Sequence, residues 1–448
     1  MSNFTRKEFF VVALMLFAMF FGAGNFILPP MLGKEAGENF YVAILFFCAT
    51  GVVLPVLGVA AVARAGTLKD LSSRVSPLFA LIFVAAIYIS IGPALAIPRA
   101  SNMPYEIMIA PYVENLDFKF GVIDGKLFIY SCIYFALNYY VCINPSKVLN
   151  TLGRYLTPIL LTLIAVFFIT ALFVTDVNIA SASERYTKHA VATAFVEGYQ
   201  TMDALAALVF GISVVAALKT YGINDEKKLS VITVKAGLFA GVILMIVYIL
   251  LGYLGYIYGN TFSAENGAVL LSSISNDLFG HFGRIILGFT ALLACITTTI
   301  GLINSTSVYF SSVTKIKYKT WVILWVVISL IIANYGLTQI LKFSVPVLIA
   351  IYPIAIVLII LSLINNLIDS SKIVYCATVY TAALIGILNA LDLSGFTIGE
   401  TKILDLIGVS PILLKLPFYD AMLGWVVPVI VMFAISFIIY SIKKKDNY

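Results

Sequence analysis

The sequence consists of long apolar stretches separated by short polar segments. A helix needs about 20 consecutive apolar residues to cross the hydrocarbon core of a bilayer. Runs such as Val322–Leu330 do not alternate between apolar and polar residues, as the strands of a membrane barrel would. We therefore predict an all-α integral membrane protein with twelve transmembrane helices, at residues 9–32, 40–63, 77–97, 127–143, 150–174, 193–217, 231–257, 284–312, 320–338, 341–364, 373–391 and 419–441.

The distribution of charge agrees with this interpretation. Only 11% of the residues are charged, whereas a soluble domain carries about 25%. Most of the 28 Lys and Arg residues fall in segments that lie on one side of the membrane if the twelve spans alternate. Since basic loops remain in the cytoplasm, we expect a multi-pass protein of the cytoplasmic membrane with both termini inside. The net charge of +6 is then explained by contact with anionic lipid, and no nucleic-acid partner is expected.

Several classes of protein are not favoured by the sequence. All five cysteines lie within predicted spans, so no disulfide framework or zinc-binding spacing is indicated. His189 and His281 fall in different loops, and no spacing typical of a catalytic site appears in the spans. The first apolar run is too long for the core of a signal peptide and is expected to be retained. We expect neither an enzyme nor a cofactor other than a coupling ion.

Two predicted spans contain residues that interrupt helices. The first span carries Gly22–Asn25 near its middle, followed by Pro29 and Pro30. The sixth span carries the polar segment Glu197–Asp203. Glycine and proline weaken a helix, and unwound backbone is tolerated in a membrane only where protein or a water-filled cavity satisfies it. A glycine pair is also typical of closely packed helices, and that alternative stays open for the first span.

The positions of the two interruptions suggest a repeat. Spans 1–5 (residues 9–174) and spans 6–10 (residues 193–364) each contain an odd number of crossings, so the second set enters the membrane from the opposite face. Inverted repeats with broken helices at matching positions are typical of secondary transporters. Exposed helix ends offer amides to an anion and carbonyls to a cation, which suits a zwitterionic amino acid with a small cation. We expect one transporter domain over residues 1–448, with spans 11–12 (residues 373–441) outside the repeats.

The eighth span supplies further oxygen atoms. The carbonyl of Ala294 and the hydroxyls of Thr297 and Thr298 share one helix face. Hard oxygen ligands of this kind suit a small cation. The ordinary alternative is that each hydroxyl bonds back to a carbonyl of its own helix.

Four motifs resemble one known family over nearly the whole chain. The sequence is similar to the BrnQ branched-chain amino acid carriers. The motifs that carry the resemblance are Phe21-Gly22-Ala23-Gly24-Asn25 with Pro29-Pro30, Gly92-Pro93 with Pro98-Arg99, Gly198-Tyr199-Gln200-Thr201-Met202-Asp203, and Ser344-Val345-Pro346-Val347 with Ile351-Tyr352-Pro353.

The resemblance implies a symporter that imports Leu, Ile and Val with Na⁺, or with H⁺, by alternating access in a LeuT-like fold of five plus five inverted helices and two extra ones. It implies that the amides of Gly22–Asn25 hold the substrate carboxylate. The expected substrate-binding residues are Gly22, Ala23, Gly24, Asn25, Glu197, Gly198, Tyr199, Thr201 and Asp203. The expected sodium site consists of Ala18, Phe21, Ala294, Thr297 and Thr298.

Some roles stay open at this point. Asp203 could carry a proton, pair with Lys342, or bond to backbone, and Glu197 has no clear counterpart in the family. The outer loop 259–282 is expected to cap an external vestibule. A channel or sensor would need a ring-forming filter or an Arg-rich voltage helix, and neither is present.

Overall fold

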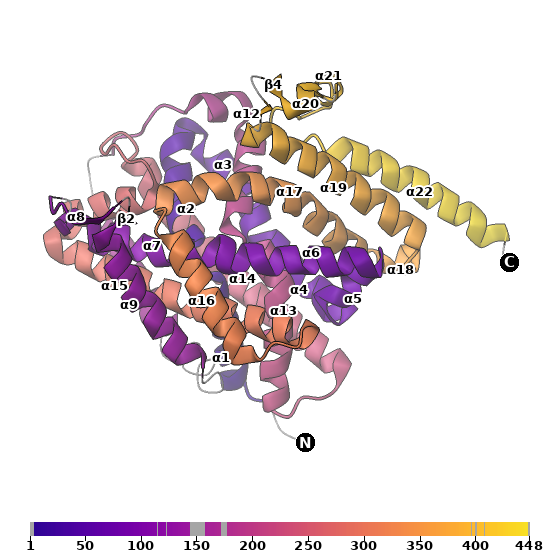
Figure 1. The fold of residues 1–448 in the computed structure, drawn as a ribbon, viewed down its shortest axis with the longest axis horizontal. Coiled ribbons are helices and arrows are strands. Elements are labelled where there is room, and N and C mark those ends of the chain that lie inside the picture. The colour runs from indigo at the N-terminus through magenta and orange to yellow at the C-terminus, as the bar shows by residue number, and fades with distance from the viewer. Residues whose placement is uncertain are drawn as a thin grey trace.

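The computed structural model describes residues 4–113, 115–121, 123–143, 157–171, 177–395, 397–398, 401–406 and 408–446. The predicted ends of the fifth span, 150–156 and 172–174, lie outside these residues. Helices dominate the described part of the chain, which also has two short antiparallel hairpins, β1–β2 and β3–β4 (Figure 1).

The first part of the chain forms the helices α1 (Arg6–Phe20), α2 (Ala23–Ala36), η1 (Gly37–Asn39), α3 (Phe40–Cys48), η2 (Ala49–Val53), α4 (Leu54–Ala65), α5 (Leu68–Ser73), α6 (Pro77–Ile89), η3 (Ser90–Ala94), α7 (Ala96–Met108), α8 (Ala110–Val113), α9 (Gly125–Cys142) and α11 (Thr157–Ala171), and the strands β1 (Lys119–Phe120) and β2 (Ile123–Asp124).

The second part forms α12 (Glu184–Glu197), η6 (Gly198–Thr201), α13 (Asp203–Thr220), α14 (Glu226–Ile257), α15 (Gly267–Val313), α16 (Tyr318–Ala333), α17 (Leu337–Leu363), α18 (Asn365–Ile368), α19 (Lys372–Ser394), β3 (Thr397–Ile398), β4 (Thr401–Lys402), α20 (Ile403–Leu406), α21 (Ser410–Leu413) and α22 (Val426–Asp446).

Polar residues at the helix starts explain several of these boundaries. Thr5 and Glu8 form a capping box at the start of α1, and the hydroxyl of Ser76 accepts from the amide of Phe79 in α6. Asp225 and Asn266 cap α14 and α15 in the same way. Each side chain satisfies an amide that has no acceptor within its own helix, so the helix begins at a defined residue.

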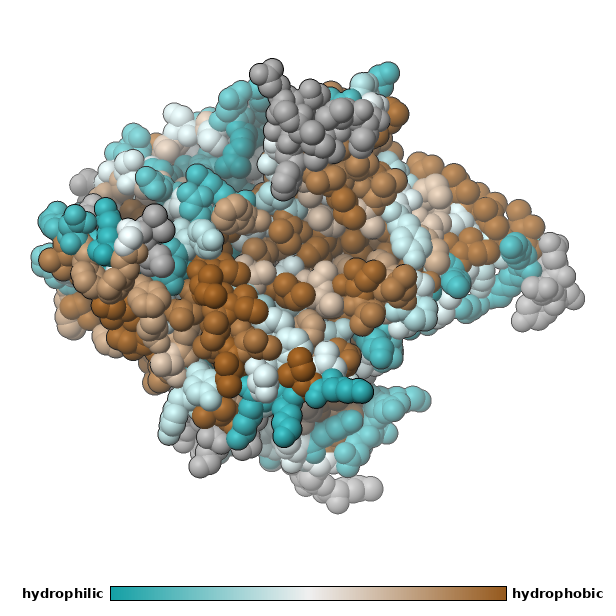
Figure 2. All heavy atoms as spheres, in the orientation of Figure 1, coloured by the Kyte–Doolittle hydropathy of each residue, from teal (hydrophilic) through white to brown (hydrophobic). Residues whose placement is uncertain are grey.

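Eight helical segments of the described chain are long and apolar enough to cross a membrane. Each of the twelve predicted stretches overlaps a helix, but α1, α9, α11 and α16 are not among the eight. The membrane class and the all-helical fold are therefore confirmed, whereas the count of twelve and the inverted repeat stay predictions. Figure 2 shows apolar residues across the middle of one face, with hydrophilic residues towards opposite rims.

The predicted interruptions of spans 1 and 6 are confirmed. Phe21 and Gly22 leave the helical conformation between α1 and α2, with ψ angles of 92° and −160°. Between α12 and α13, η6 is a 3₁₀ turn, and Met202 then takes a left-handed conformation with φ 64°. The prolines contribute less than expected, because α2 continues through both Pro29 and Pro30.

A third interruption was not predicted. The segment η3 joins α6 to α7 as a π-helical turn, and Gly92 within it has non-helical angles of φ −93° and ψ −123°. Gly92-Pro93 is one of the motifs of the family resemblance, but its effect on the helix was missed. The turn redirects α7, whose polar residues then lie inside the protein.

The prediction that residues 259–282 form an outer loop is partly wrong. α15 already begins at Gly267, and it bends at Gly280, where φ is 61°. The apolar residues Ala268, Leu270 and Leu271 are fully buried. Burial of this apolar stretch against the bundle explains why it forms helix rather than a mobile loop.

α2 lies at the centre of the bundle, where it packs along both α14 and α15. A side chain at Gly255 of α14 would collide with the backbone of Pro30, and one at Gly267 of α15 would collide with that of Ile27. These close approaches fix the broken helix against two long ones. α22, in contrast, extends away from the body of the molecule (Figure 1). Only 11% of its most apolar 18-residue stretch is buried.

Candidate functional site

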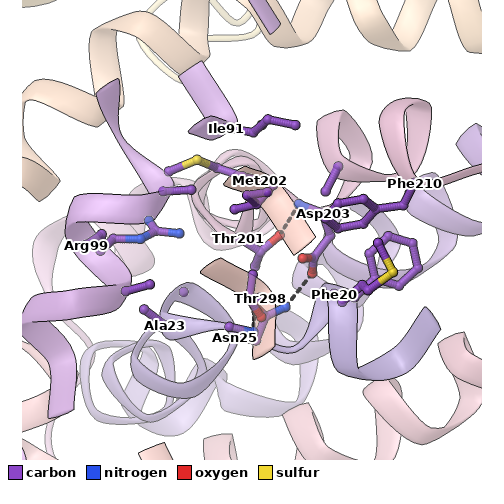
Figure 3. Close-up of a pocket in the computed structure, with 17 residues that line it drawn as sticks. Phe20, Ala23, Asn25, Ile91, Arg99, Thr201, Met202, Asp203, Phe210 and Thr298 are labelled. Carbon is purple, nitrogen blue, oxygen red and sulfur yellow. Dashed lines mark hydrogen bonds between the residues drawn. The ribbon is translucent and has the colours of Figure 1, made fainter. Parts of the chain in front are cut away.

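The two confirmed helix interruptions open onto one small cavity, with a volume of about 30 Å³ (Figure 3). A cavity of this size has room for about two water molecules. Its lining residues come from the ends of α1 and α2, from η3 and α7, from η6 and α13, and from α15. They are Met19, Phe20, Gly22, Ala23, Gly24, Asn25, Ile91, Ala96, Arg99, Ala100, Thr201, Met202, Asp203, Ala206, Phe210, Thr298 and Leu302.

The start of α2 forms one wall. Gly22 is its N-cap, and the Gly22 amide donates to Oδ1 of Asn25 over 2.9 Å. The following amides have no acceptor within the helix and carry the positive end of its dipole. A side chain at Gly22 would lie 3.1 Å from Thr298 Cγ2, and one at Gly24 would collide with the Arg99 guanidinium. The glycines thus allow both the helix interruption and the close packing of helices, which were the two alternatives for this motif.

Asp203 joins three helices at the opposite break. It is 2% exposed, and its Oδ2 accepts from Asn25 Nδ2 at 2.5 Å and from the Tyr248 hydroxyl at 2.6 Å. Asn25 Nδ2 also lies against the Tyr248 hydroxyl oxygen. The carboxylate therefore bonds side chains of α2 and α14. The alternative in which Lys342 pairs with Asp203 is wrong, because Lys342 is exposed on α17 and the carboxylate has these other partners.

Five oxygen atoms gather where α1 ends and α15 passes. The Thr298 hydroxyl lies 3.3 Å from the Ala18 carbonyl, 3.1 Å from that of Phe21 and 3.1 Å from that of Ala294. The Thr297 hydroxyl lies 2.8 Å from the Ala294 carbonyl and 3.4 Å from that of Ala18. Both threonines thus bond back to their own helix, as the ordinary alternative requires, and both also face carbonyls of α1. The structure brings together all five residues of the expected sodium site.

Three of the expected substrate-binding residues do not line the cavity. Glu197 accepts a 2.5 Å hydrogen bond from the Tyr186 hydroxyl and lies 3.6 Å from Arg185. A side chain at Gly198 would collide with Thr50, so this glycine serves helix packing. Tyr199 stacks on Tyr352 with ring centroids 4.4 Å apart. These three residues therefore have partners outside the cavity, whereas Thr201 and Asp203 line it.

Glu197 belongs instead to a charged cluster that ties α12 to α2. Arg185 bonds Glu35 at 2.6 Å, and the Ser183 amide donates to the Glu35 carbonyl. The ion pair at Arg185 is more than half exposed on the arginine side, so it contributes little to stability by itself. The cluster therefore links the end of α2 to α12.

Arg99 was missed as a site residue by the sequence reasoning. It is 2% exposed on α7, lines the cavity, and donates from Nη1 to the Gln200 carbonyl over 2.7 Å. The available signal was a charged residue directly after an apolar predicted span, in the Pro98-Arg99 motif. Ionisable residues within a membrane are rare and mark functional sites by default.

Two larger cavities open along the same long helix, α15. One, of about 410 Å³, is lined by residues of α5, α6, α13 and α15, including Tyr88, Ser305 and Tyr309. The other, of about 470 Å³, is lined by residues near the start of α15, by the end of α7, by α8 and by the segment around the start of α9, including Glu106, Ser273 and Arg284. Thr298 and Leu302, which line the small cavity, lie between the two groups on α15.

Comparison with known proteins gives a consistent result. A family model described as branched-chain amino acid transport protein matches residues 5–443. The branched-chain amino acid permease BraB of Bacillus subtilis is 40% identical, covering 97% of this chain and 95% of its own. The branched-chain amino acid transport system 2 carrier protein of Pseudomonas aeruginosa is 36% identical, covering 100% of this chain and 99% of its own.

Solved structures share the fold at low sequence identity. A mutant of the manganese transporter of Eremococcus coleocola superposes with a TM-score of 0.58 and 11% identity, covering 97% of this chain and 96% of its own. MHP1, a nucleobase-cation-symport-1 family transporter, superposes with a TM-score of 0.57 and 15% identity, covering 96% of this chain and 91% of its own. At these identities the likeness is one of fold alone.

Proposed function

Because the chain belongs to the branched-chain amino acid transport protein family, we propose that it imports leucine, isoleucine and valine across the cytoplasmic membrane together with Na⁺. The observation that carries the proposal is that both interrupted helices end at one cavity, beside a cluster of five oxygen atoms. The family consists of transport proteins and not of enzymes.

The cavity as it stands holds only about two water molecules, so an amino acid enters when the walls separate, and those walls suit an aliphatic side chain. Most of the polar groups lie near helix ends, with Thr298 in the middle of α15, and the remaining walls are apolar. Burial of each CH₂ group contributes about 0.8 kcal/mol, so larger aliphatic side chains are preferred. One methylene discriminates only modestly, and leucine, isoleucine and valine therefore compete. The apolar lining side chains are Met19, Phe20, Ala23, Ile91, Ala96, Ala100, Met202, Ala206, Phe210 and Leu302.

The oxygen cluster supports sodium as the coupling ion. Uncharged carbonyl and hydroxyl oxygens can replace the hydration shell of a small monovalent cation. Two of the carbonyls, those of Ala18 and Phe21, belong to the broken end of α1, and the hydroxyls of Thr297 and Thr298 belong to α15. An ion bound between them stabilises one arrangement of the two helices, which couples ion binding to the substrate cavity.

Proton coupling is the second candidate, and Asp203 favours it. This carboxylate is buried beside the cavity and bonded to two side chains. A change in its protonation would alter both bonds and, through Asn25, the start of α2. In that case the carboxylate, rather than the oxygen cluster, links the ion gradient to transport.

Alternating access requires the small cavity to connect to each side in turn. The 410 Å³ and 470 Å³ cavities along α15 are the routes that we assign to the two sides. In the twelve-helix arrangement with inverted repeats at residues 9–174 and 193–364, spans 1, 2, 6 and 7 move against spans 3, 4, 8 and 9. Residues 373–441 stay outside this movement.

The test is uptake of radiolabelled leucine into proteoliposomes under separately imposed gradients of Na⁺ and H⁺. We expect an inward Na⁺ gradient to drive accumulation when both faces have equal pH. Accumulation driven by a proton gradient alone would reject sodium coupling in favour of the second candidate. Absence of leucine uptake under every gradient would reject the transport proposal.

A further inference from the structure

Arg99 is a buried cation, and most of its N–H donors have no hydrogen-bond partner within the described part of the chain. Its guanidinium carries five N–H donors. Nη1 donates to the Gln200 carbonyl, and Nε has no hydrogen-bond partner. Among the described residues, no carboxylate lies within ion-pair distance of Arg99, while Asp203 accepts from Asn25 and Tyr248 instead. A buried charge of this kind is costly unless an anion bonds it directly.

The surroundings of Arg99 favour an anion at the same place. The guanidinium lies so close to Gly24 that any side chain there would collide with Nη2. Gly24 is in the first turn of α2, whose free amides also attract negative charge. Two independent features, a guanidinium fork and a helix N-terminus, therefore converge on one wall of the cavity. A carboxylate is an anion that both can bind.

The cavity presents opposite charges to its contents. Figure 3 shows Arg99 entering from α7, with Asp203 on the far side of Thr201. A free amino acid carries a carboxylate and an ammonium group on the same carbon. The positive wall and the negative wall match the two ends of this zwitterion.

We propose that Arg99 binds the carboxylate of the transported amino acid, and thereby makes a free α-carboxylate a requirement for transport. The proposal rests on the proposed function and adds a residue and a specificity to it. The start of α2 shares the carboxylate with Arg99, and Asp203 faces the ammonium end. The primary amide of leucine, which has the same side chain without the negative charge, is then excluded.

The experiment compares leucine with leucinamide in the purified full-length protein, both by competition binding and by uptake in proteoliposomes. In the unmodified protein we expect leucinamide to compete at least tenfold more weakly than leucine. In Arg99→Gln we expect leucine binding to weaken roughly tenfold to a hundredfold, as for loss of a hydrogen bond to a charged group. Leucinamide binding should stay the same or strengthen, so the preference for leucine disappears.

Two further variants keep the test decisive. Arg99→Lys retains the charge without the fork, and it should lose several-fold in leucine binding while keeping part of the discrimination. Arg64→Gln is the matched control, because Arg64 also donates to a carbonyl, that of Leu363, but does not line the cavity. It should bind leucine as the unmodified protein does. If Arg99→Gln does not fold, the Lys variant and the leucinamide comparison still decide the question.

Three outcomes would overturn the proposal. These are equal competition by leucinamide and leucine in the unmodified protein, unchanged discrimination in the folded Arg99 variants, or equal weakening of both ligands in them. Failure of the transport proposal is distinguishable, because the unmodified protein would then show no leucine uptake at all.

Discussion

The side-chain amide of Asn25 donates to the carboxylate of Asp203 over 2.5 Å, and this bond joins the two interrupted helices of the bundle. Asn25 lies in the first turn of α2, and Asp203 is the first residue of α13. The Asn25 carbonyl oxygen Oδ1 also holds the Gly22 amide, so one side chain connects both breaks. A displacement of either helix therefore moves the other through this bond, and the cavity between them changes shape.

Replacement of Asp203 by asparagine should impair leucine uptake. The change keeps the size of the side chain but removes the charge that two donors share. Each hydrogen bond to a charged group contributes about 1.5–3 kcal/mol, so we expect at least a tenfold loss of uptake in proteoliposomes. Asp392→Asn is the matched control, since Asp392 also accepts from a tyrosine hydroxyl, that of Tyr419, away from the cavity. Equal uptake by D203N and D392N would contradict the prediction.

Thr298→Ala should change the response to sodium. Removal of one of the five oxygens is expected to raise the Na⁺ concentration for half-maximal uptake roughly tenfold, with little change in leucine affinity at saturating Na⁺. Thr299→Ala is the control, because the neighbouring hydroxyl bonds the Cys295 carbonyl and Tyr134 instead. Sodium titrations of the two variants that coincide would show that the ion binds elsewhere.

Gly24→Ala should reduce uptake to less than a tenth without preventing folding. The added methyl group would collide with the Arg99 guanidinium and lie 3.2 Å from the Gln200 carbonyl, so the cavity wall must shift. Gly301→Ala offers a comparison on α15, because its methyl group would meet Met19 at an ordinary 3.6 Å. We expect full uptake for G301A, and less than a tenth for G24A at equal amounts of folded protein. Normal transport by G24A would show that Arg99 and the Gln200 carbonyl move aside without loss of function.

The substrate preference should follow aliphatic size. Leucine has three more carbons than alanine, which corresponds to about 2.4 kcal/mol of burial and roughly a fiftyfold difference in affinity. Valine and isoleucine should compete with leucine within a few-fold. Inhibition constants against labelled leucine measure this series. Equal inhibition by alanine would mean that the apolar walls do not contact the side chain.

The two larger cavities should open to opposite sides of the membrane. Ser305 lines one and Ser273 the other, and they are up to about 48 Å apart along α15. In a background without the five native cysteines, Ser305→Cys should react with an impermeant thiol reagent only from the cytoplasmic face. Ser273→Cys should react only from the outer face. Modification of both from one side would contradict the assigned routes and the predicted orientation.

Much of this arrangement could be read from the sequence, because in a membrane each departure from apolar helix stands out. Gly22 and Asp203 were identified as breaks on that basis, whereas Thr298 was placed beside the first break only by the family resemblance. Arg99 was missed, because its burial depends on the turn at Gly92, which changes where α7 runs. Glu197 was expected in the site but does not line the cavity, because closeness in sequence to a break does not fix the direction of a side chain. Its actual partner, Tyr186, lies eleven residues earlier.

The bend at Gly280 divides α15 into two unequal lengths, with Ser273 on the shorter one and the oxygen-bearing threonines on the longer one. Its positive φ suits glycine, and a side chain at this position would touch nothing within 4 Å. The bend therefore turns the short arm over the bundle, where Gly267 packs directly against the backbone of Ile27 in α2, while the long arm carries Thr298 beside the end of α1. A single helix thus contacts both halves of the interrupted α1–α2 segment, so neither half can move without a change in its packing against α15.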